Sequence, residues 1–326
     1  MKRPDTLEVI YAPVADALKQ SDELYARFLK GIPEPVGAVT RDLALASRKR
    51  LRPALVLLCS YLGAAAGGKD IALACAAELL HSASLVHDDI IDDSDLRRKQ
   101  ATLHKKWNNR VGILAGDLLY AKAFGMISDL GSGAVSALFS QAAVSMCQGE
   151  IREVLRTGAL DLAEQEYLKI LEEKTASLIA ACCGAGGILG GLSRADAQRL
   201  FEFGLSLGVG FQIVDDCLDL EGDPDLTGKE MGLDVSNSLV TLPLIFHLRQ
   251  DHGVRRRFGE ILDLAPPERL KTVRAELERS GAFEYARERA YAYRDRARME
   301  LDGLSRNGPI KEHLARMADF AVMRRY

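Results

Sequence analysis

Apolar residues recur at spacings of three and four along almost the whole chain, and this periodicity constrains the fold more than any other feature of the sequence. The segments that carry it are 7–29, 54–62, 71–91, 111–130, 135–155, 167–179, 195–220, 239–248 and 283–304. Glycine and proline, including Pro266-Pro267 and Gly308-Pro309, interrupt the pattern between segments, and no alternating strand of useful length is found. Aromatic residues, which strands favour, make up only 6% of the chain. We therefore expect an all-α fold.

The sequence shows no sign of a division into several domains. No internal repeat, long linker or change of composition divides the 326 residues, so residues 1–326 are predicted to form a single large helical domain. One uncharged segment, 175–193, approaches membrane-spanning length but contains five glycines. It is predicted to be a buried helix packed closely against its neighbours, and no integral membrane segment is expected.

The charge balance and the cysteines indicate which partners and which cellular compartment to expect. Lys and Arg number 43 against 46 Asp and Glu, so there is no bulk positive field to indicate nucleic acid as a partner. The six cysteines lie in apolar stretches without a CxxC pair, and the N-terminal MKRPDTLEV has no apolar core of a signal peptide. We expect reduced thiols and a cytoplasmic protein.

Two helical segments carry aspartates where the periodicity predicts a buried or half-buried face. Each contains the pattern DDxxD, formed by Asp88, Asp89 and Asp92 in one segment and by Asp215, Asp216 and Asp219 in the other. The first and last aspartate of each pattern lie one turn apart on the same helical face, where like charges repel. Burying such carboxylates is costly unless a cation neutralises them.

The donor set indicates which cation this would be. Only carboxylate oxygens are present, with no His or Cys at ligand spacing, and this selects a hard cation, above all Mg²⁺. Because Mg²⁺ takes few protein ligands and completes its shell with water and phosphate oxygens, several Mg²⁺ ions bridging to a diphosphate are predicted. The alternative, a solvated acidic helix end, is disfavoured by the presence of two copies.

Basic residues accompany both acidic patterns. They are Arg48, Lys49, Arg50, Arg52, Arg97, Arg98, Lys174 and Lys229. Each alone is more often a solvated charge, but together they suit two polyanionic groups, one held through metal and the other through Lys and Arg alone.

Small residues lie beneath the aspartates on the same helical faces. Gly208 and Gly204 lie below Asp215, and Ser84 lies below Asp88. These small residues either leave room for an apolar chain between the helices or allow close helix packing through glycine. A metal-bound polar head above an apolar shaft is the shape that a prenyl diphosphate requires.

In ordered succession between residues 47 and 243, the chain resembles the trans-isoprenyl diphosphate synthases, or polyprenyl synthetases. The motifs that carry the resemblance are KRLRP, ELLHSASLVHDDIIDDSDLRR, GDLLYAKAF, EEKTASL, GFQIVDDCLDLEGD, TGKEMGLD and TLP. The resemblance implies the isoprenoid synthase fold, with helices surrounding a deep central cavity, and a homodimer. It is strongest to the medium- and long-chain synthases.

The resemblance also implies roles for individual residues. Asp88, Asp92 and Asp215 would be the main ligands of three Mg²⁺ ions on the allylic diphosphate, with Asp89, Asp216 and Asp219 alongside. Arg97, Lys174 and Lys229 would hold the same diphosphate, whereas Lys49, Arg52, His81 and Arg98 would hold that of isopentenyl diphosphate. Thr175 and Gln212 would turn their oxygens toward the carbocation formed during condensation.

Product length is expected to depend on the residues just before the first DDxxD pattern. Ala83 and Ser84 stand where farnesyl-type enzymes commonly place aromatic residues, so the resemblance implies an all-trans product longer than twenty carbons. Ser84 lies beneath Asp88 on an ideal helix and Ala83 is turned away. Phe124 and Phe139 are candidates for the floor of the shaft.

The sequence departs from the family pattern at several positions, and these departures leave alternative functions open. Glycines common in the family are replaced at Ser47, Arg48 and Lys99, and a lysine before TLP is replaced by Leu239. A short-chain farnesyl or geranylgeranyl diphosphate synthase is the nearest alternative. A partner subunit of a heteromeric synthase and a terpene cyclase are further ones, although two intact DDxxD patterns disfavour both. A di-iron bundle is excluded because no ExxH pairs accompany the acids.

Overall fold

A computed structural model describes residues 6–44, 49–64, 66–97, 100–221, 232, 235, 237–250, 252–262 and 264–324. Its elements in chain order are α1 (Leu7–Tyr11), the 3-10 turn η1 (Ala12–Val14), α2 (Ala15–Lys30), α3 (Val36–Ala44), α4 (Leu51–Tyr61), α5 (Lys69–Ile91), β1 (Leu96–Arg97), β2 (Gln100–Ala101), α6 (Leu103–Lys106), α7 (Asn109–Asp129), α8 (Gly133–Arg156), α9 (Glu164–Leu171), the π-turn η2 (Glu172–Ala176), α10 (Ser177–Leu189), α11 (Arg194–Glu221), α14 (Leu242–Leu248), α15 (His252–Leu262), α16 (Pro266–Ser280), α17 (Ala282–Asp302) and α18 (Pro309–Met323). The predicted all-α class is confirmed.

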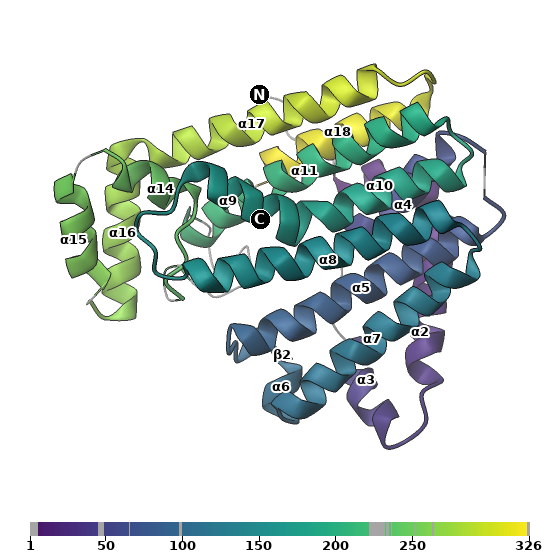
Figure 1. Cartoon of the computed structure of the whole chain (residues 1–326), viewed down its shortest axis with the longest axis horizontal. Coiled ribbons are helices and arrows are strands. Elements are labelled where there is room, and N and C mark those ends of the chain that lie inside the picture. Colours follow the sequence, from purple (N-terminus) through teal and green to yellow (C-terminus); the bar gives the residue numbers. More distant parts are fainter. Residues whose placement is uncertain are drawn as a thin grey trace.

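The long helices run side by side, and α10 lies at their centre (Figure 1). It packs against α4, α8 and α11, and every residue from Ser177 to Gly187 is buried. A Cβ atom added at Gly186 would lie 2.4 Å from the carbonyl oxygen of Val56, so only glycine allows α4 to approach this closely. The segment predicted to be a closely packed buried helix is therefore α10 and its flanking turns.

Around this centre, α5 packs against α7 and α11 packs against α17 (Figure 1). One hydrophobic core is continuous from α1 to α18, as a single domain requires, and the single-domain assignment stays a prediction. By length and composition alone, α7 is apolar enough to cross a membrane, but a third of that stretch is buried inside the protein. Its contact with α5 accounts for the buried part.

Local sequence signals fix several helix ends. The Asn108 side chain accepts a hydrogen bond from the backbone N–H of Val111 at 2.9 Å and so caps the start of α7. Pro266 and Pro309, which the sequence indicated as breakers, instead begin α16 and α18, since proline fits the first helical turn. The two-residue strands β1 and β2 form an antiparallel pair that the sequence pattern did not predict.

Candidate active site

The predicted aspartate patterns occupy the C-terminal ends of two long helices. Asp88 and Asp89 lie in the last turn of α5 with Asp92 as its C-cap residue, whereas the other three aspartates lie in the last two turns of α11. A helix C-terminus carries a partial negative charge and favours cations, yet neither helix has a basic residue in its last turn. Both ends therefore combine carboxylates with an unfavourable helix dipole, and a cation would relieve both.

At the acidic end of α5, the unfavourable burial of charge is seen in the raised pKa of Asp88. Burial raises the pKa of Asp88 to about 7, and the nearby ammonium group of Lys174 only partly opposes the rise. Asp89 is buried and accepts a hydrogen bond from Arg97 Nε at 2.6 Å. Arg97, predicted to hold a diphosphate, is thus engaged by Asp89, which leaves part of its guanidinium exposed beside the site.

The second acidic end is held by two different partners. Asp215 Oδ1 lies 3.0 Å from a terminal nitrogen of Arg324, which follows α18 and also donates to the carbonyl of Phe211 at 2.8 Å. Asp216 is buried, and both of its carboxylate oxygens accept hydrogen bonds, from Tyr167 and from Gln212. Burial raises the pKa of Asp216 to about 7 despite these two donors. Asp219 lies one turn beyond Asp215, where the prediction placed it.

Lys174 and Thr175 project from the π-turn between α9 and α10. Such wide turns are rare and occur mostly as single turns within helices at functional sites. Thr175 Oγ1 donates to Gln212 Oε1 at 3.1 Å, so the two residues predicted to face the carbocation are in contact. The structure brings together Lys174, Thr175 and Gln212 as the sequence predicted, although the prediction did not include the π-turn that presents them.

Two carboxylates on α8 belong to this site and were missed by the sequence analysis. Glu150 Oε2 lies 2.9 Å from Lys174 Nζ, and Glu153 forms a second ion pair with the same ammonium group. Although burial alone would lower it, these two carboxylates raise the pKa of Lys174 above its ordinary value. Glu153 also acts electrostatically on Asp92 and Asp216, which places it between the two acidic ends. The available signal was two acids spaced i, i+3 in the last three turns of a largely apolar helix.

The glycines beneath Asp215 serve close packing and do not line a cavity. A Cβ atom at Gly208 would lie 2.6 Å from Cα of Ala176, and one at Gly204 would lie 2.7 Å from Cα of Ala180. Of the two interpretations of these glycines, the one that left room for an apolar chain is therefore wrong. Their function is to let α11 approach the π-turn and α10.

Gly149 has the corresponding role on α8, and its replacement by alanine gives a direct test. The added Cβ would lie 2.5 Å from the backbone nitrogen of Lys174, so the π-turn would have to move. We expect Gly149→Ala to lower the free energy of unfolding by about 1–3 kcal/mol in urea titrations and to reduce turnover at least tenfold. Gly125→Ala on α7, where nothing lies within 4 Å, is the control and should be neutral or stabilising. Equal behaviour of both variants would contradict this role.

The acidic ends fit Mg²⁺ better than a metal that requires a complete protein shell. Among the residues that the structure describes, no three His, Cys, Asp or Glu side chains converge into a metal-binding group. Zn²⁺ in structural sites takes four protein ligands, whereas Mg²⁺ is commonly held by one or two carboxylates with water and phosphate oxygens. Oxygen-only donors at two separate helix ends match the second pattern. The assignment of individual aspartates as ligands stays a prediction.

The basic residues at the start of α4 form an anion-binding arrangement. Arg52 lies in the first helical turn, where free N–H groups and the helix dipole attract anions. Its Nε atom is buried without a hydrogen-bond partner in the described part of the protein, and burial lowers the pKa of Arg52. Lys49 precedes the helix, whereas Arg50 is engaged in an ion pair with Asp22 at 2.6 Å. A diphosphate bound at this helix end would bring hydrogen-bond acceptors to Arg52.

The remaining predicted residues are placed as follows. His81 lies two turns before Asp88 on α5, about 10 Å along the helix axis. Ala83 is fully buried, whereas Ser84 is half-buried and donates to the carbonyl of His81 at 3.0 Å. Phe139 is fully buried in the core and Phe124 is half-buried. Arg98 and Lys229, and also Ser47, Arg48 and Lys99, lie outside the described residues.

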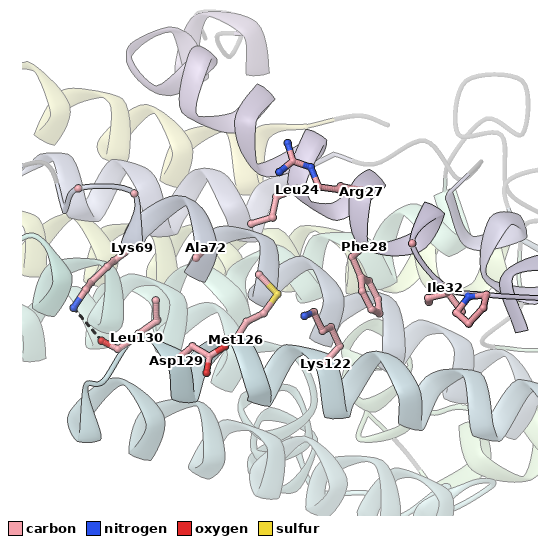
Figure 2. A pocket seen from close by; sticks show the side chains of 14 residues that line it. Leu24, Arg27, Phe28, Ile32, Lys69, Ala72, Lys122, Met126, Asp129 and Leu130 are labelled. Carbon is pink, nitrogen blue, oxygen red and sulfur yellow. Dashed lines mark hydrogen bonds between the residues drawn. The ribbon is translucent and has the colours of Figure 1, made fainter.

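A cavity of about 720 Å³ lies between α2, α5 and the C-terminal half of α7 (Figure 2). Its apolar lining includes Leu24, Phe28, Ala72, Met126 and Leu130. No residue predicted for the site lines it. However, Ala72 lies eleven residues before Ala83 on the same face of α5, about 16 Å further along the helix axis. The cavity is therefore distant from the aspartates but shares a helix face with a predicted chain-length residue.

Comparison with known proteins agrees with this geometry. The family model described as polyprenyl synthetase matches residues 34–278. The chain belongs to the polyprenyl synthetase family. A heptaprenyl diphosphate synthase component 2 from Geobacillus stearothermophilus is 34% identical over 316 residues, which cover 97% of each chain. A geranylgeranyl diphosphate synthase from Methanosarcina mazei is also 34% identical, over 90% of this chain and 91% of its own.

A solved structure shows the same fold over the whole length. It is a polyprenyl synthase from Caulobacter crescentus complexed with calcium and isoprenyl diphosphate, with a TM-score of 0.94, 29% identity and complete coverage of both chains. The expected isoprenoid synthase fold is thereby confirmed, and this polyprenyl synthetase is a prenyltransferase. Relatives of equal identity carry names that differ in product length, so identity alone does not select the product.

Proposed function

We propose that this polyprenyl synthetase condenses isopentenyl diphosphate with an allylic prenyl diphosphate to form an all-trans polyprenyl diphosphate. The allylic carbon–oxygen bond breaks, and the allylic carbon forms a new bond with the double bond of isopentenyl diphosphate. A proton is then lost, and diphosphate is released. The observation that carries this proposal is that Lys174 lies beside the acidic end of α5, while Asp216 at the acidic end of α11 is linked to Thr175 through Gln212.

The cofactor is proposed to be Mg²⁺, with three ions per site held by Asp88, Asp92 and Asp215, and with Asp89, Asp216 and Asp219 alongside. When bound, it would neutralise the charge that develops on the departing diphosphate. Lys174 and Arg97 would add direct contacts to the same diphosphate. The solved structure of similar fold that is complexed with calcium and isoprenyl diphosphate supports a divalent metal as the cofactor.

Side chains of the protein would stabilise the carbocation, bind the second substrate and exclude water. The oxygens of Thr175 and Gln212 would face the allylic carbocation and stabilise its charge. Lys49, Arg52 and His81 would hold the diphosphate of isopentenyl diphosphate through charge and hydrogen bonds alone. The apolar residues around them would exclude water, which would otherwise capture the cation.

One assay tests the reaction and the product together. The purified chain is incubated with farnesyl and isopentenyl diphosphates, with Mg²⁺ or with a chelator, and the products are identified by mass spectrometry. We expect products longer than twenty carbons with Mg²⁺ and no product with the chelator. A mixture that ends at twenty carbons would refute the proposed length, and the absence of any condensation would refute the reaction.

The same assay distinguishes the proposed enzyme from a second candidate function, that of a subunit which is active only with a partner chain. The observation favouring it is that one relative is called component 2 of its synthase, together with the substitutions at Ser47, Arg48, Lys99 and Leu239. Both DDxxD patterns are intact, which favours a chain that is active by itself. Condensation by the purified chain alone would exclude this candidate.

The proposed length above twenty carbons is supported by the small side chains before the first DDxxD pattern. Ala83 and Ser84 replace bulky residues at the depth where a growing chain would be stopped. The cavity at Ala72 lies further along the same face of α5 as Ala83, and charged side chains also line it: Arg27, Lys69, Lys122 and Asp129 (Figure 2).

Ser84→Phe is expected to shorten the product. A phenyl ring one turn below Asp88 would occupy the first part of the path, and one helical turn of about 5.4 Å is comparable to one isoprene unit. Mass spectrometry should show the main product moving to twenty carbons or fewer, with the rate of the first condensation reduced less than tenfold. Ser82→Phe is not a neutral control, because Ser82 accepts a hydrogen bond from Tyr25; Ser128→Phe on α7 is used instead. An unchanged product length in Ser84→Phe would show that this position does not line the path.

We also propose a homodimer that pairs through α7 and α8. Large apolar side chains are exposed on the two helices: Ile113, Leu114, Val144, Ile151, Val154 and Leu155. Val144, Ile151 and Leu155 are spaced i, i+7, i+11 and so form one stripe along α8. Large apolar side chains exposed in such a row can mark a protein–protein interface. A cytoplasmic location is proposed as well, and none of the six cysteines forms a disulfide bond.

The double variant Leu114→Glu/Leu155→Glu should dissociate this dimer. The two leucines are 67% and 77% exposed in the single chain, so the change would cost little there but would bury two charges per chain at the interface. Size-exclusion chromatography with light scattering should change from twice the chain mass of 35.6 kDa to one chain mass. Met299→Glu on α17, 70% exposed, is the control and should leave the mass unchanged. A wild-type monomer would contradict the proposal.

A further inference from the structure

A continuous row of side-chain hydrogen bonds joins α9, α11 and the π-turn. Tyr167 Oη donates to Asp216 Oδ2 at 2.5 Å, and Gln212 Nε2 donates to Asp216 Oδ1 at 2.9 Å. Thr175 Oγ1 then donates to Gln212 Oε1 at 3.1 Å. Tyr167 is 3% exposed and Asp216 is 7% exposed, so water cannot readily replace the bonds at that end.

The donors and acceptors in this row of hydrogen bonds fix the orientation of the Gln212 amide. Both oxygens of Asp216 accept hydrogen bonds, so Gln212 turns its NH₂ group toward Asp216 and its oxygen toward Thr175. The hydroxyl proton of Thr175 is used on that oxygen. The remaining lone pairs of Thr175 Oγ1 and Gln212 Oε1 can then face the substrate.

We propose that Tyr167 and Asp216 are positioning residues that fix the Gln212 amide with its oxygen, and not its NH₂ group, toward the developing carbocation. The inference rests on the proposed condensation and deepens it. An amide turned the other way would present its positive end to a cation and would raise the barrier that the oxygen lowers. The two residues would thus control the rate of ionisation without touching the substrate.

Asp216→Asn tests the direction of the row because asparagine carries one acceptor and one donor. The Tyr167 proton, buried beside this residue, would claim the asparagine oxygen and leave the asparagine NH₂ group facing Gln212. Gln212 would then have to reverse. We expect kcat to fall about 30-fold, while the KM for the allylic substrate changes less than about threefold.

Adding Tyr167→Phe to this variant should restore activity. Without the phenol proton, the asparagine can turn its oxygen toward Gln212, and the original amide orientation returns. We expect the double variant to regain at least about fivefold in kcat over Asp216→Asn, a non-additive gain that a merely structural network would not produce. Additive losses in the double variant, with wild type active, would overturn the inference and leave the condensation standing.

One further measurement separates this role from metal binding. Calorimetric titration of Mg²⁺ in the presence of a thiolodiphosphate analogue that does not ionise should give the same affinity for Asp216→Asn and for the double variant Asp216→Asn/Tyr167→Phe, because neither has the carboxylate and only the amide orientation differs. A higher Mg²⁺ affinity in the double variant would trace the rescue to metal binding and overturn the inference. Inactive wild-type protein would instead refute the proposed function itself.

If Asp216→Asn alone does not fold, Tyr167→Phe is compared in the wild-type and Gln212→Leu backgrounds. A positioning tyrosine lowers kcat in the first background and has no further effect in the second, because the amide through which it acts is gone. Urea unfolding of each variant establishes that all are folded at the assay temperature. An equal loss of kcat in both backgrounds would overturn the inference.

Discussion

Asp88→Asn should abolish turnover and yet make the metal-free protein more stable at pH 8. The substitution keeps the shape of the side chain and removes the charge that holds the cation at the end of α5. Removal of a group that stabilises transition-state charge commonly costs a factor of about 10²–10³ in kcat, and we expect at least the upper value here. The assay is steady-state kinetics with saturating Mg²⁺.

The stability gain follows from the pKa of Asp88. Burial raises it from 3.8 to about 7, so the folded protein holds this proton more tightly than the unfolded chain. The associated stability is fully present below pH 4 and is lost as the pH rises through 7, which amounts to at most about 4 kcal/mol at pH 8. Asparagine, which is always neutral, avoids this loss.

Urea titrations in the presence of a chelator should therefore show Asp88→Asn more stable than wild type at pH 8 and equal to it at pH 4. Adding Mg²⁺ should stabilise the wild type and not the variant. Asp93→Asn is the matched control: its side chain is 81% exposed and paired with Lys105, and asparagine tolerates its φ of 48°. That variant should keep activity within about threefold. A less stable Asp88→Asn protein at pH 8 would contradict the account of the acidic helix end.

Lys174→Met should produce the second large effect, with the opposite sign on stability. The change keeps most of the apolar stem but leaves Glu150 and Glu153 without their cation beside Asp88. Removing one partner of a buried ion pair costs several kcal/mol, and since these side chains retain 15–24% exposure we expect about 1–3 kcal/mol. Turnover should fall about 10²–10³-fold, because the lysine is also proposed to bind diphosphate.

The pH dependence distinguishes this explanation from a simple packing defect. Burial already raises the pKa of Glu153, and losing Lys174 raises it further. The variant should thus lose most stability at high pH and recover as the pH falls and the carboxylates take up protons. Lys169→Met, whose ammonium pairs with Glu172 and Glu173 at 3.5 and 3.6 Å with 53% exposure, should change stability little. A pH-independent loss in Lys174→Met would indicate packing alone.

The sequence predicted those parts of the fold in which local pattern and burial agree. The segments that became α5, α7, α8 and α11 have apolar periodicity over many turns, and the DDxxD spacing placed Asp88 and Asp92 at one end of α5. By contrast, α15 and α16 were not among the predicted segments, because they are rich in charged residues and carry few apolar ones.

The missed parts of the site depend on tertiary proximity. Arg324 reaches Asp215 across 109 residues of sequence, and Tyr167 reaches Asp216 across 49. No spacing rule connects such pairs. Glu150 and Glu153 were visible as acids in an apolar helix, but their contact with Lys174 depends on Gly149, which allows the close approach of α8.

The π-turn gives the site a dependence on chain length as well as on residue identity. One residue more than a regular helical turn rotates everything after it by about 100° relative to everything before it. Deletion of Glu172 or of Ala176 would leave Lys174 and Thr175 in the chain, yet would swing either α9 or α10 out of phase with its neighbours. The direction in which Lys174 and Thr175 project from the helix thus depends on the number of residues in the π-turn. A comparison of residue types alone would overlook this dependence.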